Sequence, residues 1–278
     1  MRMNDGGYLQ ACTYSLPSAP NMARPHKEAL ALPEVNFSED GEVRYLHLGS
    51  EWVQGSMILD KPFEIELDYV RRMMAWLLFV DLDDVKDLHA MQLGLGAAAL
   101  TKYCFKKLGM LTTAVEINPQ VAMMCRQWFK LPPNQARLNV VMGDAGEVIR
   151  QPEWAGAVDA LQVDLYDHLA AGPVLDSVDF YADCKRLLSL NGAMTVNLFG
   201  RHASFDVSMA NMAQVFGEDA IWAFTPTREG NCVVLAQARA NEVSRMELLK
   251  QAQAIEDRYA LPAVHWLKMF KPWRDAAK

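Results

Sequence analysis

The sequence has few cysteines, and they form no pattern. Its 278 residues include five, without a Cys-x-x-Cys pair: Cys12, Cys104, Cys125, Cys184 and Cys232. An odd, scattered set argues against a disulfide framework and a zinc site. The six histidines also lack the spacing of metal ligands, so we predict no metal. Reduced thiols favour a cytoplasmic protein.

Long apolar runs and an excess of positive charge are also missing. A membrane-spanning helix needs ~18 consecutive apolar residues. The most apolar stretch, residues 74–80, is much shorter and is typical of a buried helix. Lysine and arginine number 27 against 34 aspartates and glutamates, a net charge of −7. Because nucleic-acid binding needs clustered basic residues, we predict no nucleic-acid partner. Because no apolar run is long enough to span a membrane, we predict no membrane partner.

Hydrophobic residues make up 51% of the chain and charged residues 22%, which allows a packed core. Residues 1–36 are rich in Pro, Ser, Asn and Gly and are predicted to form a loose arm. Two short strands joined at Gly49-Ser50-Glu51 predict a small β-hairpin subdomain over 37–66. Residues 67–240 are assigned to a nucleoside-binding α/β domain. Residues 241–278 are assigned to a C-terminal helix and tail.

From residue 67 onward the predicted strands and helices alternate. Strands are expected near 88–93, 111–116, 138–142, 158–163, 193–198, 220–225 and 231–237. Helices are expected over 67–82 and near 97–108, 119–130, 176–190, 204–216 and 246–259. Strands separated by helices pair parallel, whereas the last two, with a short connection, should pair antiparallel. The predicted fold class is α/β: a seven-stranded, mostly parallel sheet with helices on both faces, resembling class I S-adenosylmethionine-dependent methyltransferases.

The segment from Leu88 to Glu116 reads as an apolar strand, a glycine turn, a helix, and a strand ending in a carboxylate. Gly94-x-Gly96-x-x-Ala99 fits a relaxed nucleotide-binding turn, in which glycines let the backbone approach the ligand. Glu116 follows Gly94 by 22 positions, close to the ~20 expected for an acid that binds ribose hydroxyls. The alternatives are a turn that merely needs small residues and an exposed strand-end charge. We predict a nucleoside site.

Two later strands also end in carboxylates. Gly143-Asp144-Ala145 closes the third strand, where Asp144 can accept from an adenine amine or cap the following short helix. Asp164 and Asp167 follow the fourth strand, over the crevice where ligands bind in such sheets. They are expected to face the reactive end of a donor. The alternative is that they cap a loop.

Together these residues resemble the spermidine synthase family, the polyamine aminopropyltransferases, over residues 41–237. A small β-structure precedes a methyltransferase-like sheet, as in that family. The other matching segments are Asp68-Tyr69-Val70-Arg71-Arg72-Met73, Val115-Glu116-Ile117-Asn118, Gly143-Asp144-Ala145 and Asp164-Leu165-Tyr166-Asp167-His168.

The resemblance implies a transferase that uses an adenosyl sulfonium co-substrate, decarboxylated S-adenosylmethionine or S-adenosylmethionine, and a small-molecule amine acceptor. It makes Asp167 the candidate base, with Tyr69 and Asp164 positioning the amine. It also implies a homo-oligomer, since family members commonly dimerise or tetramerise. Donor contacts fall on Gln54, Gly94, Gly96, Glu116, Asp144 and Ala145, and acceptor contacts on Asn197 and Arg228.

The chain also departs from the family. Gly96 stands where the family keeps an aspartate that contacts the donor's ammonium, Arg228 replaces an acceptor-side tyrosine, and His168 replaces a proline. Three alternatives therefore stay open: a methyltransferase that uses intact S-adenosylmethionine, a non-catalytic relative, and a dinucleotide-dependent dehydrogenase. The acceptor cannot be named from the sequence.

Overall fold

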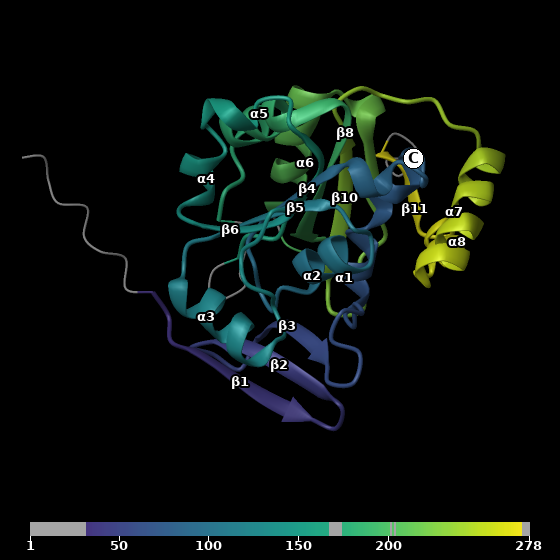
Figure 1. Cartoon of the computed structure of the whole chain (residues 1–278). Coiled ribbons are helices and arrows are strands. Elements are labelled where there is room, and N and C mark those ends of the chain that lie inside the picture. The colour runs from purple at the N-terminus through teal and green to yellow at the C-terminus, as the bar shows by residue number, and fades with distance from the viewer. Residues whose placement is uncertain (1–31, 167–173, 201, 203, 274–278) are drawn as a thin grey trace, which may run out of the picture. The chain divides into compact units, whose positions relative to one another are not determined.

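The computed structural model describes residues 32–166, 174–200, 202 and 204–273 (Figure 1). The chain divides into two units between Leu32 and Pro33, and the description below concerns the second. Among the described residues no helix is long and apolar enough to cross a membrane.

A three-stranded antiparallel sheet opens this unit, formed by β1 (Val35–Asp40), β2 (Val43–Leu48) and β3 (Val53–Ile58). The hairpin predicted from the sequence is β2–β3. Strand β1 is an addition, because its sequence VNFSED lacks the apolar alternation that marks a strand. The β2–β3 register jumps between Leu46 and His47, which pair with Gly55 and Val53, so that Gln54 is the bulged residue.

The main sheet has the order β11-β9-β10-β8-β7-β4-β5-β6. Strands β6, β5, β4, β7 and β8 pair parallel, and β8, β10, β9 and β11 pair antiparallel. The predicted fold class is confirmed, with eight strands in place of seven, because three-residue β11 is too short to leave a sequence pattern. The bounds are β4 (His89–Leu93), β5 (Leu111–Glu116), β6 (Leu138–Met142), β7 (Val158–Val163), β8 (Leu188–Phe199), β9 (Ile221–Phe224), β10 (Asn231–Gln237) and β11 (Phe270–Pro272).

Helices cover both faces of this sheet (Figure 1). Alternate strand residues enter different cores: Ala90 packs in a cluster with residues of α2 (Ala99–Lys106) and α7 (Arg245–Tyr259), and Met91 in a cluster with residues of α5 (Val178–Leu187) and α6 (Ser204–Phe216). The α-helices are α1 (Asp68–Arg72), α2 (Ala99–Lys106), α3 (Pro119–Trp128), α4 (Ala145–Val148), α5 (Val178–Leu187), α6 (Ser204–Phe216), α7 (Arg245–Tyr259) and α8 (Ala263–Trp266). Short 3₁₀ helices are η1 (Ala75–Phe79), η2 (Val85–Asp87), η3 (Pro152–Trp154) and η4 (Glu218–Ala220).

The helix predicted over 67–82 is interrupted, and this correction has a physical reason. The Met73 carbonyl accepts from the Thr195 hydroxyl at 3.0 Å and the Gln162 amide at 3.3 Å, both from the sheet. The Leu77 N–H instead donates to Met74 O at 3.1 Å. The segment therefore divides into α1 and η1, and hydrogen bonds from β7 and β8 hold the end of α1 against the sheet.

Candidate functional site

The turn between β4 and α2 is bounded by backbone on two sides. Gly94 has a φ of +89°, and a Cβ there would lie 2.3 Å from the Asp164 carbonyl oxygen. Gly96 has a φ of +49°, and a Cβ there would lie 2.8 Å from the carbonyl oxygen of Gln54. A Cβ on Gly55 would lie 2.6 Å from the Ala97 nitrogen. Only glycine fits these close approaches, so the turn is held between β3 and the end of β7.

Glu116 ends β5 with its carboxylate turned into this region. The Leu95 N–H donates to its Oε2 at 3.0 Å, and the Asn118 N–H donates to its Oε1 at 2.8 Å. Burial raises its pKa, and these backbone hydrogen bonds act in the opposite direction. Only 8% of Glu116 is exposed, so the alternative of an exposed strand-end charge is wrong. A carboxylate has about four lone-pair sites, which leaves room for ribose hydroxyls.

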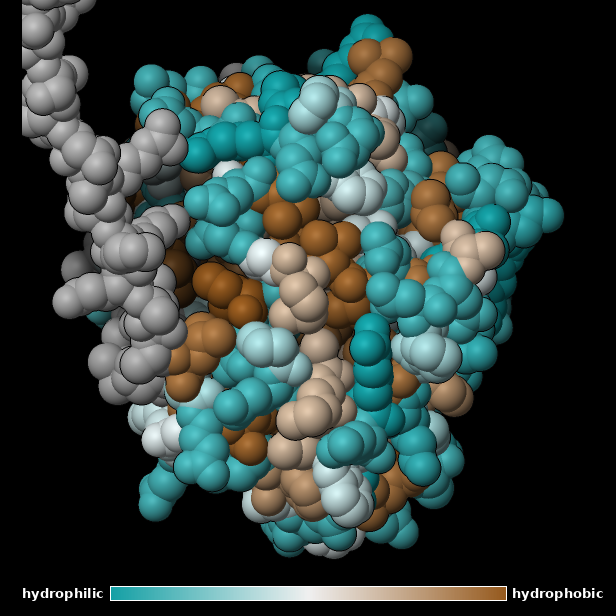
Figure 2. Space-filling view, turned by 60° about the vertical axis from the view of Figure 1, so that its left-hand side comes forward, coloured by the Kyte–Doolittle hydropathy of each residue, from teal (hydrophilic) through white to brown (hydrophobic). Residues whose placement is uncertain are grey.

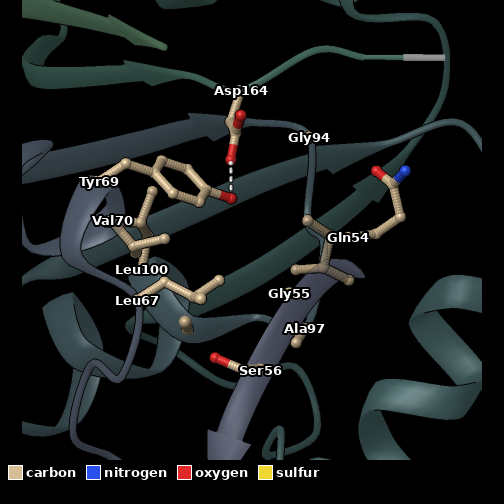
Figure 3. Close-up of a pocket in the computed structure, with 12 residues that line it drawn as sticks. Gln54, Gly55, Ser56, Leu67, Tyr69, Val70, Gly94, Ala97, Leu100 and Asp164 are labelled. Carbon is tan, nitrogen blue, oxygen red and sulfur yellow. Dashed lines mark hydrogen bonds between the residues drawn. The ribbon is translucent and has the colours of Figure 1, made fainter. Parts of the chain in front are cut away.

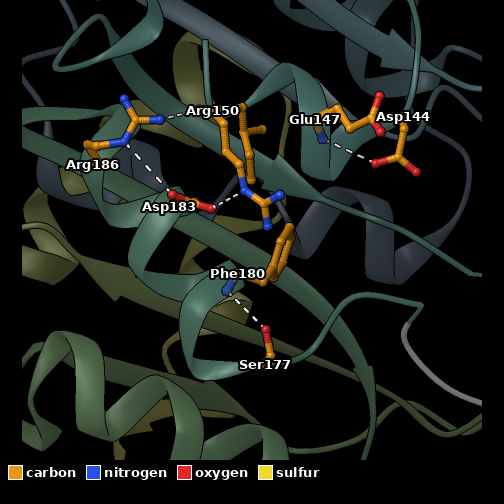
Figure 4. Close-up of polar contacts among 8 residues, drawn as sticks. Asp144, Glu147, Arg150, Ser177, Phe180, Asp183 and Arg186 are labelled. Carbon is orange, nitrogen blue, oxygen red and sulfur yellow. Dashed lines mark hydrogen bonds and ion pairs between the residues drawn. The ribbon is translucent and has the colours of Figure 1, made fainter. Parts of the chain in front are cut away.

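Asp144 caps α4, because its Oδ1 accepts from the Glu147 N–H at 3.1 Å (Figure 4). Close by, Arg150 and Asp183 form an ion pair of 2.8 Å that joins the end of α4 to α5. The N-cap alternative is therefore observed, and an adenine contact stays a prediction. Ala145 is the first residue of α4 and is buried.

Exposed apolar side chains accompany these two acids. Ile117, next to Glu116, is 46% exposed, and Met142, two residues before Asp144, is 45% exposed. On the face that carries α3 and α4, Figure 2 shows apolar residues gathered between hydrophilic ones. Exposed apolar side chains next to carboxylates suit a flat base with polar edges.

Asp164 follows β7 and is the centre of a polar cluster. The Tyr69 hydroxyl on α1 donates to its Oδ2 at 3.2 Å (Figure 3), and the Asn197 amide on β8 donates to its Oδ1 at 3.0 Å. Burial raises the Asp164 pKa, while both hydrogen bonds lower it. Burial and the Asp164 charge together raise the Tyr69 pKa well above its usual value. Tyr69 is therefore a neutral donor, and Asp164 an acceptor held from two sides.

A small pocket of about 30 Å³ lies between Asp164, Tyr69, the glycine turn and β3 (Figure 3). A space of this size holds one or two waters, whereas sites for whole ligands span about 300–1,000 Å³. The pocket thus suits the end of a chain rather than a nucleoside. Gln54 lines it, and the buried Gln54 Nε2 has no hydrogen-bond partner among the described residues. Apolar lining comes from Leu67, Val70, Leu95, Ala97, Ala99 and Leu100.

Comparison with known proteins assigns this arrangement to a family. A polyamine aminopropyltransferase from Chromobacterium violaceum is 35% identical over 240 residues, which cover 86% of this chain and 88% of the relative. One from Neisseria meningitidis is 33% identical with the same coverage. The chain belongs to the polyamine aminopropyltransferase family. No family model matches the sequence.

Solved structures share the fold of this aminopropyltransferase family member. A probable spermidine synthase from Corynebacterium glutamicum has a TM-score of 0.68 at 18% identity, covering 86% of this chain and 88% of its own. Human methyltransferase-like protein 13 in complex with SAH has a TM-score of 0.62 at 22% identity, with 69% and 92% covered. A spermidine synthase with the transition state analogue AdoDATO has a TM-score of 0.60 at 13% identity, covering 85% and 82%.

The structure brings five of the residues expected from the aminopropyltransferase resemblance together around one pocket. Gln54, Tyr69, Gly94 and Asp164 line one pocket, and Asn197 binds Asp164. Asp167, the predicted base, lies outside the described residues. Arg228 is exposed between β9 and β10, and within the described part no hydrogen bond or ion pair joins it to this pocket.

Sequence reasoning missed Asn231, the first residue of β10. Its Nδ2 donates to Asn197 Oδ1 at 3.1 Å. The missing information was that β10 pairs antiparallel with β8, which brings Asn231 and Asn197 to one end of the sheet. Within the described residues, no group of three or more His, Cys, Asp or Glu is placed to hold a metal ion.

Proposed function

We propose that this chain transfers an aminopropyl group from decarboxylated S-adenosylmethionine to a small-molecule amine. The observation that carries the proposal is the Asp164 carboxylate, which Tyr69 and Asn197 hold in a pocket beside the glycine turn. The relatives named polyamine aminopropyltransferase support it.

In this reaction a neutral amine attacks the carbon next to a positively charged sulfur. The N–C bond forms, the C–S bond breaks with its electron pair going to sulfur, and the released nucleoside is methylthioadenosine. The acceptor must first lose a proton, because alkyl amines, like lysine, have pKa values near ~10. A carboxylate in a desolvated cleft can accept that proton and orient the amine. Asp167 remains the predicted base, and Asp164 with Tyr69 is proposed to hold the amine.

The donor's nucleoside would lie over the ends of β5 and β6. The free lone pairs of Glu116 suit the ribose diol. Asp144, beside Ala145, would accept from the adenine amine. Gly94 and Gly96 let the backbone approach the donor. Gln54 Nε2, which has no partner among the residues that the structure describes, offers a donor to a ligand oxygen or nitrogen.

The acceptor side is proposed to include Asn197 and Arg228. Arg228 is a cation that would repel a diamine and attract a carboxylate. An acceptor amine that also bears an acid group fits this side chain better than a plain diamine. We further expect a homo-oligomer, as the resemblance implies, which light scattering on the purified protein tests. A cytoplasmic location is expected from the scattered cysteines.

The decisive experiment supplies purified protein with decarboxylated S-adenosylmethionine and a panel of amines, putrescine included, and measures methylthioadenosine. Asp164→Asn should lower turnover by roughly 10²-fold, because the amine loses the group that positions it, while Glu116→Gln should chiefly raise the KM for the donor. Absence of product with every diamine, polyamine and amino-acid amine would reject the proposal.

A second candidate is a methyltransferase that uses intact S-adenosylmethionine. Two observations favour it: Gly96 carries no acid to repel the carboxylate of that donor, and Gln54 Nε2 has no partner in the described part of the chain and could donate to that carboxylate. Calorimetric titration with both donors separates the candidates. Preference for the decarboxylated donor supports aminopropyl transfer, and preference for the intact donor supports the methyltransferase.

A further inference from the structure

A chain of hydrogen bonds runs from the Asp164 carboxylate to Asn231, the first residue of β10. Asn197 Nδ2 donates to Asp164 Oδ1 at 3.0 Å, and Asn231 Nδ2 donates to Asn197 Oδ1 at 3.1 Å. The Tyr69 hydroxyl occupies the other oxygen of Asp164 at 3.2 Å. Three separate elements, α1, β8 and β10, thus converge on one carboxylate.

The direction of these bonds is fixed by chemistry. An ionised carboxylate only accepts, so Asn197 must present its NH₂ group to Asp164. Asn197 then presents its carbonyl oxygen to Asn231, which must answer with a donor. Asn197 is 3% exposed, so its amide has little water with which to exchange partners. The Asn197 backbone carbonyl is fastened as well, because the Tyr166 hydroxyl donates to it at 2.8 Å.

The β9–β10 loop holds Asn231 in place. The Asn231 N–H donates to Thr227 Oγ1 at 3.2 Å, and its carbonyl oxygen accepts from the Thr227 N–H at 2.7 Å. The Asn231 backbone is therefore anchored independently of its side chain, which leaves the side-chain amide to face Asn197.

We propose that Asn231 is a positioning residue that acts through Asn197 to orient the Asp164 carboxylate; the catalytic part of this inference rests on the proposed function. Without its donor, the Asn197 amide can turn its oxygen toward Asp164. A carboxylate that faces an amide oxygen loses a hydrogen bond and gains a repulsion. Among the described residues, the titratable groups that face Asp164 are the Tyr69 and Tyr166 phenols, and β8 contributes the Asn197 amide.

Asn231→Leu, which has nearly the same shape without polar atoms, tests the relay. We expect kcat to fall roughly three- to tenfold, the effect of one net hydrogen bond, with KM for the donor little changed. In an Asn197→Ala background the same substitution should have almost no further effect, because the relay is already broken. Asn139→Leu is the matched control: it makes the same substitution on β6, where the Asn139 side chain accepts from Asn134 Nδ2 at 2.9 Å, and should leave turnover unchanged.

A second readout does not depend on turnover. The Asp164 carboxyl resonance, assigned with Asp164→Asn, should titrate at a higher pKa in Asn231→Leu than in the wild type. If the wild type turned over no amine, the proposed function would fail while this titration still tested the relay. An unchanged Asp164 pKa, or equal losses of kcat in both backgrounds, would overturn the inference.

Discussion

The Tyr69 hydroxyl donates to Asp164 Oδ2 across 95 residues of sequence, from the first helix of the domain to the end of its central strand β7. α1 can hold Tyr69 there because the sheet binds the Met73 carbonyl four residues later. The hydrogen bonds that interrupt the helix at Met73 therefore also hold Tyr69 in place against Asp164.

Replacing Tyr69 with phenylalanine should lower kcat about tenfold, because hydrogen bonds to charged groups contribute about 1.5–3 kcal/mol. The loss removes a bond that lowers the Asp164 pKa, so the acid limb of the pH–rate profile should move to higher pH. Tyr103→Phe is the control. It removes a buried phenol bond to Tyr259 O at 2.9 Å outside the pocket and should leave kcat unchanged. Equal kcat in wild type and Tyr69→Phe would contradict the assignment.

Two substitutions at Asp144 separate its capping role from a ligand role. Serine is a good N-cap but is too short to reach a ligand, so Asp144→Ser should keep thermal stability and weaken donor binding several-fold. Asp144→Ala should weaken donor binding to the same extent and should also lose about 1 kcal/mol of unfolding free energy, because alanine cannot cap α4. Calorimetric titration and urea denaturation measure the two effects. Unaltered donor affinity in both variants would leave Asp144 as a cap alone.

A methyl group at Gly94 should disrupt the fold of the site. Gly94→Ala combines a positive φ with a contact of 2.3 Å to the Asp164 backbone, so we expect a loss of more than about 3 kcal/mol of unfolding free energy. Gly109→Ala is matched for conformation, with a φ of +69°, but its Cβ would meet only Lys86 Cβ at 3.8 Å. It should lose about 1 kcal/mol. Similar losses of unfolding free energy in the two variants would show that the positive φ, and not the close approach to Asp164, makes glycine necessary at position 94.

A buried lysine should give the stability a pH dependence. Lys102 is 1% exposed and donates to Phe129 O at 2.7 Å at the end of α3. Burial lowers its pKa from 10.5 to about 8. Between these values the unfolded chain binds more protons than the folded one, so this group makes stability rise with pH. Below pH 8 Lys102 is charged in both states, so the full cost of burying its charge is subtracted from the unfolding free energy.

Lys102→Met should therefore be more stable than the wild type near pH 7, and the difference should shrink as pH rises from about 8 toward 10.5. Comparing the two proteins cancels the opposing ionisation of Cys104, whose pKa burial raises. Cys125 is coupled to Lys102, so the comparison is made in a Cys125→Ala background. Lys268→Met, at an exposed site, serves as control and should show no such trend. A stability difference independent of pH would exclude a neutralised Lys102.

Carboxylates at strand ends were predictable because a parallel sheet brings those ends to one edge. Glu116, Asp144 and Asp164 each follow an apolar run, so their common location follows from strand and helix alternation alone. The fold class was predictable for the same reason. The family resemblance supplied what alternation cannot, the nature of the donor.

Other features depend on contacts between distant segments. Asn231 faces Asn197 only through the pairing of β10 with β8. The division of residues 67–82 follows from Thr195 and Gln162, more than 80 positions away. Gln54 is a bulge residue because of the β2–β3 register. In each case the local sequence is compatible with a more regular structure, and tertiary hydrogen bonds decide against it.

The short strand β11 has a consequence for how molecules meet one another. It covers β9 at one edge of the main sheet with three residues, Phe270, Lys271 and Pro272. Phe270 is buried, Lys271 carries a charge, and Pro272 has no N–H to offer. A short edge with a charge and a proline is a poor template for another chain's strand. Because β11 covers β9, this edge of the sheet should resist the strand-to-strand aggregation that an uncovered β9 would allow.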